Sequence, residues 1–343
     1  MLFGLMGTSM ACAPRFPEPF WTGAHLAYAT TTDVEICAGS WIVQDWYVEL
    51  LSELLGVKLP RPVHFAFIER SEREEFCYDD DPLGCAIGDE SYSIYAVQLH
   101  ELAHAVAKPA GIRGPAAFQE GFAEVFSDGQ DSDPERLPIA DVVGDFAADG
   151  GSYYTAGLFV RFLIEEYGLE KLLAFMRRTN EDDRIEGFSE VFEDVYGVAL
   201  DDSFVDFEDY PSCTMWNNRI ALFECASPEV PWNGAAWRAT SSLACDSPDV
   251  LGPVPDGDKM LIWTTRTVEI QSDGEYLATV EGDVTGSAGA RITRCASCWD
   301  SVDAQVNVGR ARTLTLTAGR YFVTFIKEVQ EPGALTLSLS RLP

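Results

Sequence analysis

The sequence predicts an α+β protein in two parts, a mainly helical part with a small N-terminal sheet and then an all-β sandwich. In the first part, apolar residues recur at the three- and four-residue spacing of amphipathic helices. From about residue 260 onward they alternate with period two, in short runs separated by turn sequences such as SDG, EGD and AGR. We therefore expect a signal-like segment and linker over 1–20, a first domain over 21–210 and a sandwich over 226–343.

Periodicity and helix breakers place the elements of the first domain. We expect strands over 25–31 and 63–68 and helices over 40–55, 95–108, 114–126, 154–167, 169–178 and 188–196. Gly56 and Pro109 each follow a helix, as residues that stop helices do. The acidic stretches over 78–81 and 128–133 lack the spacing of an EF-hand and are interpreted as solvated loops.

Composition and charge exclude several classes of protein. The chain has 55 acidic and 24 basic residues, a net charge of −31, so nucleic-acid phosphates would be repelled. No apolar run reaches the roughly 18 residues of a membrane span. Neither a P-loop, a G-x-G-x-x-G fingerprint nor a G-x-S-x-G serine motif is present.

The cysteine count indicates export. Nine cysteines are an odd number, and Cys12 is the outlier, because it follows MLFGLMGTSMA, which resembles the end of a bacterial lipoprotein signal. An ordinary secretory signal is the alternative to a lipid anchor at Cys12. The other eight are enough for four disulfides, so we expect an extracellular or cell-envelope location.

Spacing suggests some of the disulfide pairs, although it does not determine them. Cys77 with Cys85, and Cys213 with Cys225, are close enough for local pairs. Cys295 and Cys298 form either one tight disulfide or two separate ones.

The stretch LHELAHAVA holds two of the four histidines in the chain. His100 and His104 are four residues apart, so on a helix they share one face and present two imidazoles to one ion. Glu101 lies beside the first histidine, and in the H-E-x-x-H arrangement this glutamate is the general base that activates water. Packing histidines are the alternative, but such a pattern is rare in a chain this poor in histidine.

The next expected helix reads PAAFQEGFAEVF and supplies the third ligand. Glu120 lies sixteen positions beyond His104, so its carboxylate can return to the same ion. Glu124 is one helical turn further and faces the same way, so we expect it to orient a ligand histidine through the outer N–H group. Solvated helix glutamates are the alternative for both residues.

HELAH followed by QEGFAEVF resembles the gluzincin metallopeptidases, the group of thermolysin and aminopeptidase N. The resemblance covers about residues 24–205 and is greatest to small bacterial gluzincin-like proteins. It implies a zincin-like catalytic domain in which His100, His104 and Glu120 hold Zn²⁺ and Glu124 supports a ligand histidine. The same group supplies a tyrosine to the oxyanion near the start of a later helix, which falls on Tyr154.

We therefore expect a secreted or surface-anchored zinc metallopeptidase with Glu101 as base and Tyr154 as oxyanion donor. Tyr153 is adjacent and could exchange roles with Tyr154. A peptide or protein is the expected substrate, and the lack of a GAMEN-like motif favours an endopeptidase. The alternatives are a zinc hydrolase of other amides or esters and a non-catalytic surface binding protein in which zinc is a structural staple.

Overall fold

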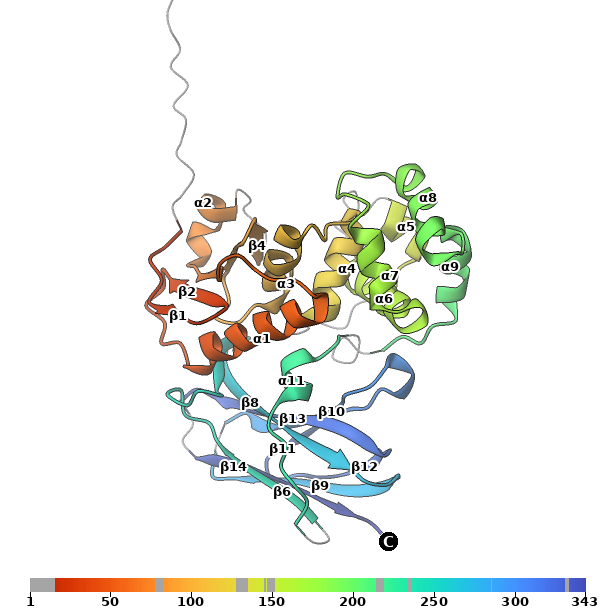
Figure 1. Cartoon of the computed structure of the whole chain (residues 1–343). Coiled ribbons are helices and arrows are strands. Elements are labelled where there is room, and N and C mark those ends of the chain that lie inside the picture. The colour runs from red at the N-terminus through yellow and green to blue at the C-terminus, as the bar shows by residue number, and fades with distance from the viewer. Residues whose placement is uncertain are drawn as a thin grey trace, which may run out of the picture.

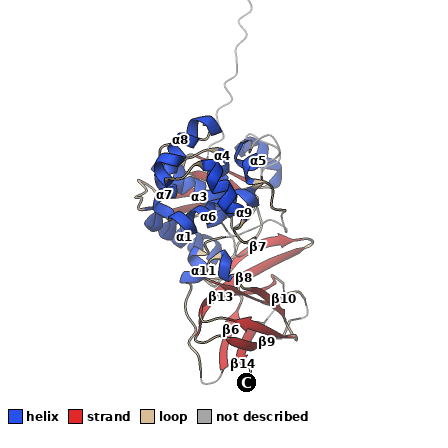
Figure 2. Ribbon diagram, turned by 90° about the vertical axis from the view of Figure 1, so that its right-hand side faces the viewer, coloured by secondary structure: helices blue, strands red, loops and turns tan. Residues whose placement is uncertain are grey.

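The computed structural model describes residues 16–77, 83–127, 135–144, 146, 152–213, 219–233, 236–284, 286–330 and 333–343. Cys12, most of the signal-like segment and linker, and both acidic stretches lie outside these residues. Helices and three β-sheets are both present, so the α+β prediction is confirmed. Figure 1 shows the helices gathered on one side of two stacked sheets, and Figure 2 shows the same division from a second direction.

The first part of the chain contains β1 (Trp21–Thr22), β2 (Leu26–Thr30), α1 (Gly39–Leu55), β3 (Val63–Phe67), α2 (Arg73–Cys77), β4 (Gly84–Ile87), β5 (Glu90–Ser93), α3 (Leu99–Ala107), α4 (Ala116–Phe126), α5 (Ile139–Gly144), α6 (Tyr153–Tyr167), α7 (Leu169–Met176), α8 (Ile185–Tyr196), α9 (Leu200–Glu208) and α11 (Leu222–Ala226). The second part contains β6 (Ala236–Ser242), β7 (Leu251–Asp256), β8 (Lys259–Ile270), β9 (Gly274–Gly282), β10 (Ala288–Arg294), β11 (Asp303–Asn307), β12 (Ala311–Leu316), β13 (Gly319–Glu328) and β14 (Ala334–Arg341).

The first sheet has the strand order β1-β2-β3-β5-β4. Strands β2, β3 and β5 are parallel, while β4 runs antiparallel to β5 at one edge. One face packs on α1 and α3 through buried side chains such as Tyr28 and Phe65, and the other face is covered by Phe76 of α2. The position of α3 is therefore fixed by its packing on this face of the sheet.

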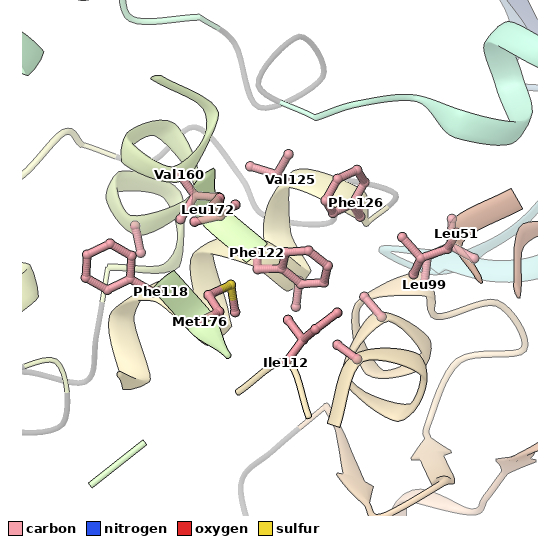
Figure 3. Packing of buried hydrophobic residues seen from close by; sticks show 14 of the residues in the cluster. Leu51, Leu99, Ile112, Phe118, Phe122, Val125, Phe126, Val160, Leu172 and Met176 are labelled. Atoms are coloured by element: carbon pink, nitrogen blue, oxygen red, sulfur yellow. The ribbon is translucent and has the colours of Figure 1, made fainter. Parts of the chain in front are cut away.

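Aromatic and aliphatic side chains bind α3, α4, α6 and α7 into one core. Phe122 of α4 lies in the middle, with Phe118 of the same helix and Val160 of α6 to one side and Leu99 of α3 to the other (Figure 3). Phe118 contacts the rings of Phe159, Phe175, Phe188 and Phe192. Large buried rings dominate the energy of such a core, so this packing fixes α4 relative to α3.

Two antiparallel sheets form the second part, with the strand orders β11-β10-β13-β8-β7 and β12-β9-β14-β6. Alternate residues of both sheets enter a separate core, for example Tyr321 and Val323 of β13 and Leu337 and Leu339 of β14. Inward and outward side chains alternate along each strand, as in a β-sandwich whose two sheets each bury one face.

Three of the four disulfides join the two parts, and two of them differ from an expected pair. Cys77 is bonded to Cys85, as predicted, but Cys213 is not bonded to Cys225. Each instead reaches the turn after β10, where Cys295 and Cys298 form two separate disulfides. The four bonds are Cys37–Cys245, Cys77–Cys85, Cys213–Cys298 and Cys225–Cys295. They indicate an oxidising compartment.

Several elements differ from the sequence prediction. The helix expected from residue 95 begins at Leu99, because Gln98 is extended with φ −152°. The periodicity did not predict β4, β5, α5 or α9, and the runs MLIWTT and TVEIQ form the single strand β8. Within the described residues, no helix combines the length and apolar character needed to cross a membrane.

Candidate metal centre

Helix α3 presents His100 and His104 on one face, because they are separated by about one turn. The segment before the helix is held by the buried Gln44 of α1. Its amide nitrogen donates to the carbonyl of Ala96 (3.1 Å), and its amide oxygen accepts from the backbone N–H of Gln98 (3.2 Å). This clamp fixes where α3 begins and therefore where both imidazoles point.

Helix α4 carries Glu120 and is held against α6 by the glycine that follows it. A Cβ atom on Gly121 would lie 2.4 Å from the carbonyl oxygen of Ala156, so only glycine permits this approach. Glu120 thereby faces α3, while most other residues of α4 are buried. The sequence QEG thus places a candidate metal ligand beside a contact between two helices.

The structure brings the three predicted ligand residues together. Oε2 of Glu120 lies 3.0 Å from Nε2 of His100 and 3.2 Å from Nε2 of His104. One donor atom from each residue lies within 4.8 Å of the other two. The two imidazole rings are 4.9 Å apart and steeply inclined, so they approach the carboxylate from two directions.

Opposite charges perturb the acid–base properties of this group in the metal-free chain. Burial alone would lower the pKa of His100, but the carboxylates of Glu120, Glu124 and Glu101 outweigh it and hold this pKa well above its usual value. Burial would likewise raise the pKa of Glu120, but the two histidines hold it well below its usual range. A proton on His100 and a metal cation would therefore compete for the same group of side chains.

Two nitrogens and one carboxylate oxygen are the donor set of a catalytic zinc site with an open fourth position. Ligands about 2 Å from a tetrahedral ion lie about 3.3 Å apart, close to the distances from Glu120 to the two histidines. The residues present therefore fit zinc. The described residues contain no second group of three such side chains.

The other predicted acids lie close to this group. Glu101 follows His100 on α3 and is buried beneath the edge strand β4. A Cβ atom on Gly84 of β4 would lie 2.8 Å from Cγ of Glu101, so the strand passes directly over this side chain. Oε2 of Glu124 lies 3.6 Å from Nδ1 of His100, on the side of the ring away from Glu120.

The two tyrosines at the start of α6 lie in different environments. The hydroxyl of Tyr154 is buried and donates to the carbonyl of Cys213 at 2.7 Å, so the oxyanion role expected for Tyr154 does not fit this position. The ring of Tyr153 instead lies 5.8 Å from the ring of His100 and is 38% exposed. Of the two, Tyr153 is the tyrosine beside the candidate metal centre.

Sequence reasoning missed Gly84, because no helical or strand pattern singled out the short stretch GCAI. The glycine directly before Cys85 was the available signal, since a glycine inside a strand often marks close backbone approach. Tyr153 was recognised only as a neighbour of Tyr154, and the sequence contained no signal to separate them.

No protein-family model and no curated protein matches the chain. Solved structures similar to a part of it include the pre-peptidase C-terminal domain of a collagenase from Bacillus anthracis, at 14% identity over 33% of this chain and 94% of that one, with a TM-score of 0.24. Another is the C-terminal CBM6 of LamC from Zobellia galactanivorans, at 12% identity over 30% and 99%, with a TM-score of 0.20. Similarity at this level assigns no function to the chain.

Proposed function

We propose that the protein is an exported, zinc-dependent metallopeptidase of the gluzincin type. The observation that carries the proposal is the convergence of His100, His104 and Glu120 on one point, with Glu101 on the same helix. A lipid anchor at Cys12 and cleavage within the substrate chain belong to the same proposal.

Zinc in this position would act as a Lewis acid on the peptide carbonyl and would lower the pKa of a water molecule. His100, His104 and Glu120 would hold the ion, and Glu124 would orient the His100 ring. Glu101 takes the proton from the attacking water and passes it to the leaving amine. The hydroxyl of Tyr153 donates a hydrogen bond to the oxygen that gains charge during attack.

The edge strand β4 favours a peptide over other amides and esters. Among the described strands it pairs only with β5, so its outer edge offers backbone hydrogen-bonding groups next to Glu101. An extended peptide binds to such an edge by adding a strand to the sheet. The scissile bond would then lie over α3.

A structural zinc staple is the alternative that the site supports less well. Such sites are closed by four protein ligands. The described residues supply three to this group, and the glutamate needed for water activation is present beside them.

The test combines elemental mass spectrometry with hydrolysis of a quenched fluorescent casein. We expect about one zinc per chain, lost in His104→Ala and Glu120→Ala. Glu101→Gln should keep the zinc and lose activity by roughly 100- to 10,000-fold. Glu190→Gln, on an exposed position of α8, is the matched control and should change neither. Wild-type protein that takes up no zinc, or a Glu101→Gln variant of full activity, would refute the proposal.

A further inference from the structure

A cavity of about 880 Å³ lies between the two parts of the molecule. Its floor is the outer face of the β8–β13–β10–β11 region, and its roof comes from α11 and the segment before α3. This volume lies within the usual range for small-molecule sites. The proposed peptidase function does not use it.

Neighbouring strands place the floor residues in rows. Thr265 of β8 is paired in register with Thr324 of β13, and Arg291 of β10 and Gln305 of β11 continue this polar row. The next row runs from Trp263 through Ile326 and Gly289 to Asn307. An indole ring, an aliphatic side chain and an amide of this row therefore line the floor.

The roof is aromatic and carries a buried ion pair. Tyr95 and Phe223 line it, and Arg219 of the roof pairs with Glu224 of α11. The guanidinium of Arg219 lies 5.6 Å from the ring centre of Phe322 on the floor, so roof and floor meet at this side.

The charges that line the cavity are compensated within the protein. Arg219 is paired with Glu224, and Arg291 is paired with Asp303 at 3.1 Å. An anionic ligand would have to compete with these carboxylates and would be repelled by a chain of net charge −31. The lining therefore favours a neutral ligand.

One buried hydroxyl in the floor has an unmet hydrogen-bonding capacity. Thr265 is 4% exposed, and its Oγ1 has no hydrogen-bond partner among the described residues. A buried hydroxyl without a partner costs stability, so such groups mark places where water or a ligand binds. Gln305 and Asn307 add amides that both donate and accept, as a hydroxyl-rich ligand requires.

We propose that this cavity binds a neutral oligosaccharide. Sugar rings offer apolar faces, which fit the rings of Trp263 and Tyr95, and hydroxyl groups that both donate and accept, which fit Thr265 and the two amides. Binding here would hold the protein on a glycan while the candidate metal centre remains free. The inference does not depend on the peptidase proposal.

The probe is an array of immobilised neutral and acidic oligosaccharides, followed by calorimetry with the strongest soluble binder. We expect binding to neutral members, with Kd raised about tenfold or more in Trp263→Ala and severalfold in Thr265→Val. Trp299→Ala, at an exposed position, and Thr336→Val, at a half-buried one, both lie outside the cavity. They are the matched controls and should bind like the wild type.

Glu101→Gln should bind the same oligosaccharide with unchanged Kd, which separates this site from the peptidase proposal. If Trp263→Ala does not fold, Thr265→Val decides, because valine has nearly the shape of threonine. Binding to no array member, binding to acidic members alone, or cavity variants that bind like wild type would each overturn the inference.

Discussion

Tyr153 and Tyr154 are neighbours in the sequence, but the first turn of α6 points their side chains about 100° apart. Tyr153 therefore faces His100 across the gap between helices, while Tyr154 enters the core and reaches the backbone of Cys213. The helical turn from one residue to the next thus places Tyr153 at the candidate site and Tyr154 in the core.

Phenylalanine substitutions test this assignment. Tyr153→Phe should lower kcat for casein hydrolysis by roughly 100-fold with little change in KM, because it removes a donor used mainly in the transition state. Tyr154→Phe should leave kcat within a few fold and cost about 1 kcal/mol of stability, because the carbonyl of Cys213 loses its donor. The reverse pattern would return the role to Tyr154.

The His100–Glu120 pair makes the stability of the metal-free protein dependent on pH. The raised pKa of His100 adds stability that is complete below its unfolded value of about 6.5 and is lost as pH rises through the folded value. The lowered pKa of Glu120 adds stability above its unfolded value of about 4.5, which is lost only at lower pH.

In EDTA, Glu120→Gln should therefore lower Tm more at about pH 6 than at about pH 9. Differential scanning calorimetry of wild type and variant at both pH values measures the difference. An equal loss at the two pH values would contradict the ion pair.

At the scale of elements, the contact between α4 and α6 positions Glu120, the third candidate ligand. Gly121 follows Glu120 and lies against the backbone of Ala156, so the two helices meet without an intervening side chain. The edge strand β4 similarly depends on Gly84 to pass over Glu101. On both sides of the candidate site, the close approach of the backbone requires a glycine, because a Cβ atom would clash.

Gly121→Ala should destabilise the protein by about 1–3 kcal/mol and weaken zinc binding, because α4 must move away from α6. Urea unfolding and zinc titration measure the two effects. Gly187→Ala is the matched control: it lies within α8 with nothing near its added Cβ and should be neutral or stabilising by up to about 1 kcal/mol. Equal effects of the two substitutions would show that close packing at Gly121 is unimportant.

At the scale of the whole molecule, covalent and hydrogen bonds join the two parts. Cys37–Cys245 lies where α1 begins, and the backbone N–H of Gly39 donates to the carbonyl of Val250 at 2.9 Å. Ser40 adds a hydrogen bond from its hydroxyl to the carbonyl of Gly252. The cavity proposed to bind an oligosaccharide is lined by residues of the same two parts.

Replacing Cys37 and Cys245 together by serine should cost about 2–5 kcal/mol, because this disulfide closes a loop of 208 residues and so restricts the unfolded chain strongly. Cys77→Ser with Cys85→Ser, which opens a loop of only 8 residues, should cost less. Denaturant unfolding of both variants gives the comparison, and a larger cost for the short loop would contradict the expected order.

The sequence alone determined the α+β class, the pairing of His100 with His104 and the choice of Glu120. The class and the shared face of the two histidines follow from local periodicity, because residues four apart share a helix face wherever that helix lies. Glu120 was chosen because it lies on the next expected helix and matches the third ligand that the gluzincin resemblance implies. Only the tertiary structure decided which tyrosine faces His100, that Cys213 and Cys225 bond to the β10 turn, and that β4 covers Glu101. The physical reason is that helix rotation, strand order and disulfide partners depend on packing between segments far apart in the chain, which local spacing does not encode.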